Sequence, residues 1–109
     1  MSEERFRGGQ PRYISRGVSE YIPKDIQIFL WKMVDILKTS INPDYLQVFR
    51  LETIGNIEDG TLVQVITHSQ ERPDYERTYY FPMVEKGVTE KIYIIDSEEY
   101  ATMILADEY

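Results

Sequence analysis

The stretch PKDIQIFLWKMVDILK, from Pro23 to Lys38, has the clearest periodicity in the chain and decides the fold. At about 100° per residue its large apolar side chains gather on one arc, as in a helix that covers a core. The members of this arc are Ile26, Phe29, Leu30, Met33, Val34, Ile36 and Leu37. Pro23 suits the start of a helix, because its missing N–H would have no helical partner there. The sequence therefore predicts one long amphipathic helix.

Two large apolar residues of this helix, Ile28 and Trp31, lie outside the arc. One interpretation is that the N-terminal segment folds over them, since large apolar groups are usually inside. The other is that they bind a partner, since tryptophan is enriched at interface hot spots.

Four segments after the helix have the alternation of β-strands. They span residues 44–53, 61–67, 75–81 and 91–96. Their short links, including the hairpin signal Asp59-Gly60, predict an antiparallel four-stranded meander. Residues 98–109 are expected to form a short C-terminal helix, with a fifth strand as the alternative. The expected class is α+β, with the long helix packed on the sheet.

The length of 109 residues corresponds to one domain. Residues 1–12 are polar and glycine-rich and are expected to be a disordered tail, so that residues 13–109 make up a single α+β domain. The sequence has no cysteine, no apolar stretch of membrane-spanning length and no signal-peptide pattern. A cytoplasmic location is the expectation.

The formal net charge of −7 argues against a nucleic-acid binder, which needs a basic surface for phosphates. Strands 61–67 and 91–96 carry apolar residues on both faces, and such strands are normally covered twice. One helix covers one face, so we expect a homodimer or a protein partner on the other. The tyrosine-bearing sheet face with Tyr79 and Tyr93 is a candidate for that contact.

Catalytic and metal sites receive less support from the sequence. The single histidine, His68, precedes Arg72 and Tyr75 in the segment HSQERPDY, and a ligand site beside these three residues is the alternative to a binding surface. Acidic residues also cluster near the C-terminus, but their spacing fits no calcium loop, and a solvated acidic surface is the better interpretation. They are Asp96, Glu98, Glu99, Asp107 and Glu108. No metal, cofactor or catalytic residue is expected.

Several blocks of this sequence resemble a known family. They are IPKDIQIFLW, DYLQVFRL, HSQERPDYERTYYF and KIYIIDSEEYATMILADEY. They are similar to blocks of the domain of unknown function family 960, small proteins of low-GC Gram-positive bacteria. The resemblance covers nearly all of residues 15–109 and implies a whole-domain match and a bacterial, cytosolic protein. It implies no activity, cofactor or site residue.

Two functions are compatible with these observations. The first is a protein-binding or regulatory module that uses Ile28 and Trp31 or the sheet face with Tyr79 and Tyr93. The second is a small enzyme or ligand-binding protein with its site near His68, Arg72 and Tyr75. The sequence favours the first, because no set of residues has the spacing of a catalytic motif.

Overall fold

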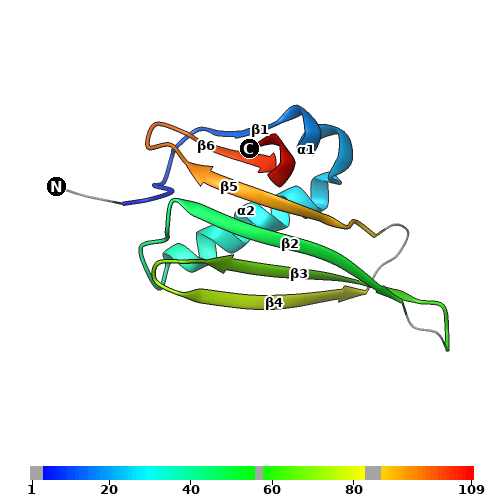
Figure 1. The fold of residues 1–109 in the computed structure, drawn as a ribbon. Coiled ribbons are helices and arrows are strands. Elements are labelled where there is room, and N and C mark those ends of the chain that lie inside the picture. Colours follow the sequence, from blue (N-terminus) through cyan, green and yellow to red (C-terminus); the bar gives the residue numbers. More distant parts are fainter. Residues whose placement is uncertain (1–3, 56–57, 83–86) are drawn as a thin grey trace.

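The computed structural model describes residues 4–55, 58–82 and 87–109 and consists of one six-stranded sheet with the long helix α2 on one side (Figure 1). The strands are β1 (Arg12–Ile14), β2 (Leu46–Gly55), β3 (Leu62–Gln70), β4 (Tyr75–Pro82), β5 (Glu90–Asp96) and β6 (Ala101–Leu105). The helices are α1 (Arg16–Tyr21), α2 (Lys24–Lys38) and the C-terminal 3₁₀ turn η1 (Ala106–Glu108). The chain is thus α+β.

The strand order is β1-β6-β5-β2-β3-β4, with β1 parallel to β6 and the other pairs antiparallel. The expected four-stranded meander is therefore wrong: β5 pairs with β2 instead of β4. The burial of their side chains fits the inner position of β5 and the edge position of β4. Ile92 and Ile94 of β5 are fully buried, so β5 lies between β6 and β2. In β4, Glu76, Arg77 and Thr78 are exposed, which suits an edge strand.

The expected C-terminal helix is also wrong, and the alternative of a strand is the one observed. Ala101, Met103 and Leu105 alternate on the buried face of β6 with half-buried residues. This period of two is that of a strand. Strand β1 ends at Ile14, because Ser15 caps α1 by accepting a hydrogen bond from the N–H of Val18.

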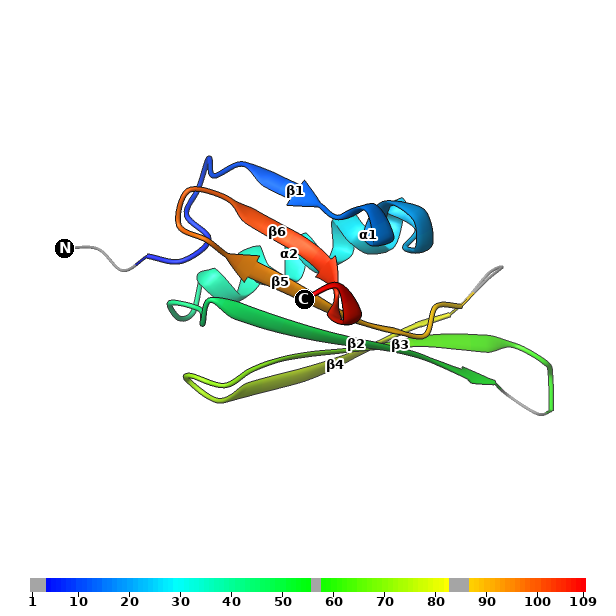
Figure 2. The same cartoon turned by 45° about the horizontal axis from the view of Figure 1, so that its top comes forward.

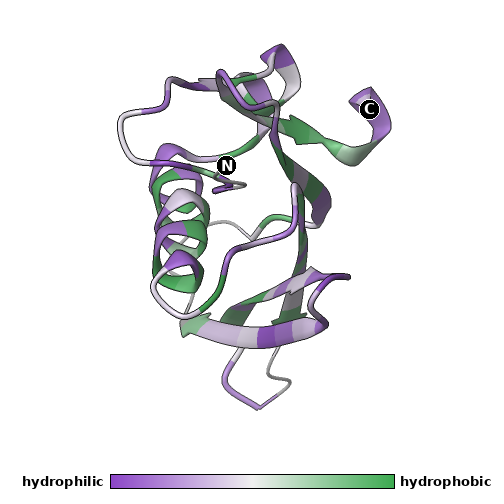
Figure 3. Ribbon diagram, turned by 90° about the vertical axis from the view of Figure 1, so that its left-hand side faces the viewer, coloured by the Kyte–Doolittle hydropathy of each residue, from purple (hydrophilic) through white to green (hydrophobic). Residues whose placement is uncertain are grey.

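Helix α2 covers one face of the sheet, as the apolar arc predicts (Figure 3). Leu30 and Val34 are fully buried against residues such as Phe49 and Ile92. The arc is narrower than predicted, since Ile36 is 47% exposed. The N-terminal segment also adds to this core, because Phe6 is fully buried. Residues 4–12 therefore differ from the expected disordered tail, while residues 1–3 lie outside the described part.

All five glutamines of the sequence are buried. Each donates its side-chain amide to at least one backbone carbonyl. The acceptors are Glu98 for Gln10, Val18 and Ile22 for Gln27, Asp44 for Gln47, Glu52 and Val88 for Gln64, and Pro73 for Gln70. A buried amide needs such partners, because leaving a polar group unpaired in the core is costly. Gln27 thus joins α2 to α1, and the side chains of Gln64 and Gln70 attach loop residues to β3.

Candidate functional site

The face of the sheet that points away from α2 carries a band of partly exposed apolar side chains. We call this surface the open face. Its apolar centre consists of the half-buried Leu46, Val48, Tyr93, Ile95 and Ile104 around the buried Val65, and its charged residues are Arg50, Glu52, Glu76 and Lys91. Figure 1 looks onto this face, with α2 behind the sheet, and Figure 3 shows α2 on the opposite side. In the described residues, no α-helix covers it.

Tyr93 lies in the middle of the open face, on β5 and directly opposite Val48 of β2 and Ile104 of β6. Its ring meets that of Tyr109 edge to face, with 5.4 Å between centroids. The Lys91 ammonium lies 5.6 Å from the ring centre. The C-terminal turn η1 therefore reaches one part of the open face and leaves the aliphatic residues beside it accessible.

The position of η1 is fixed by the carboxylate of Glu108. It accepts hydrogen bonds from the Ser15 hydroxyl (2.5 Å), the Leu105 N–H (2.7 Å) and the Gly17 N–H (3.1 Å). These bonds, with that from Ser15 the strongest, lower the pKa of Glu108. The C-terminus is thereby attached to the start of α1, beside β1 and β6 (Figure 2).

The other residues considered as partner contacts lie elsewhere. Tyr79 is on the helix-covered face, where its ring packs against Phe29 at 5.4 Å between centroids, so Tyr79 and Tyr93 do not share a surface. Trp31 is half-buried beneath the Arg12 guanidinium, whose centre lies 4.8 Å from the ring, and Arg12 also pairs with Asp35. Ile28 remains 58% exposed. The N-terminal strand thus covers Trp31 and leaves Ile28 open.

His68 is fully buried under α2 and belongs to a network with Gln47 and Gln70. The Gln47 amide nitrogen donates to Gln70 Oε1 (2.7 Å) and to the Asp44 carbonyl (2.8 Å). Gln47 Oε1 is then left as an acceptor 2.6 Å from His68 Nε2, so His68 carries its proton on Nε2. Burial lowers the pKa of His68 from 6.5 to about 4. It is a neutral donor inside the core.

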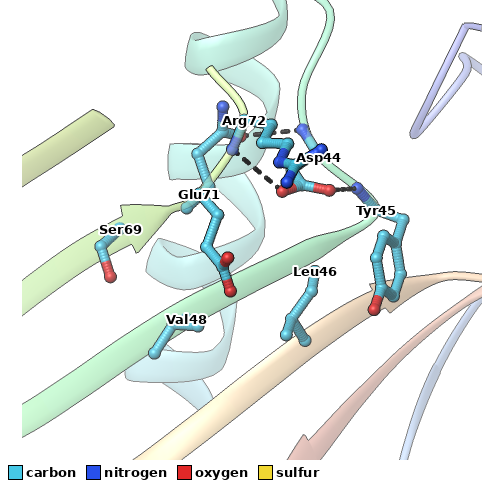
Figure 4. Close-up of a pocket in the computed structure, with 8 residues that line it drawn as sticks. Asp44, Tyr45, Leu46, Val48, Ser69, Glu71 and Arg72 are labelled. Atoms are coloured by element: carbon cyan, nitrogen blue, oxygen red, sulfur yellow. Dashed lines mark hydrogen bonds between the residues drawn. The ribbon is translucent and has the colours of Figure 1, made fainter. Parts of the chain in front are cut away.

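Of the three residues of the alternative ligand site, His68 and Tyr75 do not line the cavity that Arg72 lines. Tyr75 meets the buried His68 ring edge-on at 5.4 Å between centroids, on the helix-covered face. Arg72 instead lines a cavity of about 350 Å³ at the end of the open face (Figure 4). The cavity is also lined by Asp44, Tyr45, Leu46, Val48, Ser69, Gln70 and Glu71. Both oxygens of Asp44 are used there, by the backbone N–H groups of Tyr45 and Arg72.

Acidic residues of the C-terminal region have structural partners. Asp96 is buried and accepts from the Gln10 amide at 2.5 Å, and Glu108 holds the start of α1. In the described part of the chain, no group of three or more acidic or histidine side chains is placed to share a metal ion. No helix in the same part is long and apolar enough to cross a membrane.

Comparisons with known proteins identify the family of this chain. A family model described as "Staphylococcal protein of unknown function (DUF960)" matches residues 11–108. The chain belongs to this family. A crystal structure of a protein of unknown function from Enterococcus faecalis is similar over 99% of this chain and 98% of that chain, with a TM-score of 0.77 and 26% identity. No curated protein matches the chain. Neither match names an activity.

The open face could have been found from the sequence more easily than the burial of His68. Apolar residues on both faces of residues 61–67 and 91–96 indicate a surface that one helix cannot cover. The polar neighbours of His68 suggest that the strand ends there. The strand instead continues to residue 70, and the side chain of Gln70 is buried. The alternation of buried Gln64, Ile66, His68 and Gln70 was the available signal.

Proposed function

We propose that this DUF960 protein is a protein-binding module and that the open face is its contact surface. The observation that supports the proposal is the row of Ile104, Tyr93 and Val48, which runs across three neighbouring strands without an α-helix over it. Contiguous exposed apolar patches are uncommon in monomeric proteins and mark interaction sites. Tyrosine at the centre of such a patch supplies both apolar area and a polar hydroxyl.

The charges around the row suit a protein partner. Arg50 and Lys91, which are opposite each other on β2 and β5, share this face with Glu52 and Glu76, so the face is close to neutral although the chain carries −7. A neutral patch on an acidic molecule lets an apolar partner surface approach, and the remaining acidic surface favours a partner with basic residues around its contact area. The partner we propose therefore has an apolar contact surface with a basic rim.

A differential capture experiment tests this function. Tagged wild type, Val48→Glu and Ile28→Glu proteins are used as baits in extract of the native host, and captured proteins are quantified by mass spectrometry. Both substitutions place a carboxylate at a partly exposed apolar position, one on the open face and one on α2. We expect one protein to be enriched by wild type and Ile28→Glu and lost with Val48→Glu.

The same data can contradict the proposal. A partner retained by Val48→Glu and lost with Ile28→Glu would move the contact surface to α2, next to Trp31. Equal capture by all three baits, or none above an untagged control, would exclude a partner on the open face. Circular dichroism and thermal melts of the three proteins separate loss of binding from loss of folding.

A small-ligand site is the second candidate, supported by the 350 Å³ cavity beside Arg72. Its lining joins a guanidinium, the carboxylate of Glu71 and the Ser69 hydroxyl above Leu46 and Val48 (Figure 4). Ligand pockets combine apolar walls with a few polar groups of this kind. Titration of isotopically labelled protein with a fragment library tests the site. Binding would move the amide signals of residues 44–48 and 69–72 together, and Arg72→Ala would abolish the shifts.

A further inference from the structure

The two edges of the sheet differ in a way that points to self-association. One edge is β1, which has three residues and is followed at once by α1. The other edge is β4, eight residues long and paired with β3 on one side (Figure 1). In the described residues, no strand pairs with its outer side. A row of unpaired N–H and C=O groups of this length is a template for another strand.

Strand β4 has few of the features by which proteins usually protect a sheet edge, namely the charges of Glu76 and Arg77 and the proline at its last position, Pro82. Residues 75–81 contain no proline, glycine or lysine. Their register with β3 runs without a bulge from Tyr75 opposite Gln70 to Phe81 opposite Gln64. The two charges, Glu76 and Arg77, are adjacent and of opposite sign, so the strand itself does not repel a second copy. Tyr80 is 65% exposed.

We propose that β4 pairs antiparallel with β4 of a second copy, with a two-fold axis through Thr78. Side chains opposite each other in such a pair point to the same side of the sheet. The α2-covered faces therefore align only when the axis passes through a residue, and its position fixes every cross-strand pair. The pairing joins two six-stranded sheets into one.

The residue types select Thr78 over its neighbours as the axis. An axis at Arg77 or Glu76 would set two like charges directly opposite each other, which is unfavourable. An axis at Thr78 sets threonine opposite threonine, Arg77 opposite Tyr79, Glu76 opposite Tyr80 and Tyr75 opposite Phe81. Thr–Thr, arginine–aromatic and aromatic–aromatic pairs are all favourable across strands. An axis at Tyr79 would instead face Arg77 with Phe81 and leave Glu76 opposite Pro82.

Packing on the helix side supports the same pairing. Phe29 of α2 already contacts Tyr79 and Phe81 of β4, with centroids 5.4 Å and 4.6 Å away. In the proposed pair, Tyr75 of the second copy lies opposite Phe81 and extends this aromatic cluster across the junction. On the other side, the two open faces become one continuous surface. The occupant of the edge is thus a second copy of this chain, because the strand is complementary to itself.

Mass measurement tests the association. Sedimentation velocity of the full chain from about 5 to about 500 µM should show a concentration-dependent shift from 12.9 kDa to twice that mass. Thr78→Lys places two ammonium groups opposite each other and should leave a monomer. Thr67→Lys is the matched control, since Thr67 is the neighbour of Thr78 on β3 and on the same face, one strand inward.

The two lysine variants separate edge pairing from stacking of open faces. Dimers lost with Thr78→Lys and retained with Thr67→Lys support the proposal. Dimers lost with Thr67→Lys and retained with Thr78→Lys would show contact between the open faces and overturn it. A wild-type monomer at the highest concentration would overturn it as well. Both threonines are on the sheet surface, and thermal melts check that each variant is folded.

The absence of cysteine from the sequence allows the register to be tested. In Thr78→Cys the two introduced sulfur atoms face each other across the axis, at a Cβ separation near that of a disulfide. In Glu76→Cys they are four residues apart along the strands, about 13 Å, and cannot join. We expect mild oxidation to give a covalent dimer on a non-reducing gel with Thr78→Cys and a monomer with Glu76→Cys. The reverse pattern would overturn the register.

Discussion

The ring of Phe49 lies almost parallel to the imidazole of His68, with 4.3 Å between centroids and 16° between planes. Both side chains are fully buried, and Tyr75 closes the imidazole from its edge. Among the described residues, Nδ1 of His68 has no hydrogen-bond partner. A second proton on this ring would therefore have no acceptor. Burial also disfavours the charged imidazolium, so His68 stays neutral.

The neutral state of His68 predicts a pH-dependent stability. The unfolded chain binds a proton at pH 6.5, whereas the folded chain binds it at about 4, so unfolding takes up a proton in between. Stability is complete above pH 6.5 and falls as the pH is lowered toward 4. Between about pH 7.5 and about pH 5 we expect a loss of about 2 kcal/mol in the free energy of unfolding. Urea titrations at both pH values measure it.

The control for this prediction is His68→Gln, which keeps an N–H donor for Gln47 and does not titrate. The difference in pH dependence between wild type and this variant isolates His68 from the carboxylates. Equal slopes in the two proteins would show that His68 is protonated as easily in the folded chain as in the unfolded one.

The buried amide of Gln64 acts as a clamp on the segment before β5. It accepts from the Val88 N–H at 2.8 Å and donates to the Val88 carbonyl at 2.9 Å. Gln64→Leu leaves both backbone groups of buried Val88 unpaired, and we expect a loss of about 1–3 kcal/mol. The exposed neighbour provides the control Thr89→Ala, for which the melt should be unchanged. Hydrogen exchange at the Val88 amide should accelerate in Gln64→Leu alone.

Gly17 is at a close approach of α1 to the C-terminal turn. A Cβ atom at this position would lie 2.7 Å from both Glu108 Oε2 and Leu105 Cδ1. Gly17→Ala should therefore destabilise the protein by about 1–3 kcal/mol through overpacking. Gly8→Ala is the control, because a Cβ there meets no atom within 4 Å. Equal melting temperatures of the two variants would contradict this packing.

Trp31 is the single tryptophan and reports on the N-terminal strand. The Arg12 guanidinium covers its ring, so Arg12→Ala should expose it to water. We expect the emission maximum to move to longer wavelength and acrylamide quenching to become stronger. Arg16→Ala removes only the surface pair with Glu20 and should leave the emission unchanged. An unchanged spectrum in Arg12→Ala would place β1 away from Trp31.

Local patterns predicted the elements better than their arrangement. The 3.6-residue period over Ile26 to Leu37 and the alternation in residues 46–51 depend on which side of one element is buried, and both are visible in the sequence. Strand order depends on contacts between distant segments. The position of β5 between β2 and β6 follows from the burial of Ile92 and Ile94 on a sheet whose other members had to be known first.

Only part of the candidate site could be predicted from the sequence, because the rest depends on contacts between distant segments. A surface that one helix cannot cover was visible in the doubly apolar strands, and Tyr93 lies on it. The prediction that Tyr79 and Tyr93 lie on one sheet face was wrong, because it required the positions of β4 and β5 relative to each other. Met103 and Leu105 fit both a helix and a strand, and their pairing with Ile94 and Ile92 decided for the strand.

The parallel pairing of β1 with β6 sets the order in which the molecule is completed during synthesis. The partner position of Arg12 in this pairing, Ala101, is made 89 residues after it. Until then β1 has no strand to join, and the Ser15 and Gly17 contacts with Glu108 are also missing. The central strands β2 and β3 can pair beforehand, because they follow each other in the chain. The pairing of β1 with β6 can therefore form only after residue 103 has been made.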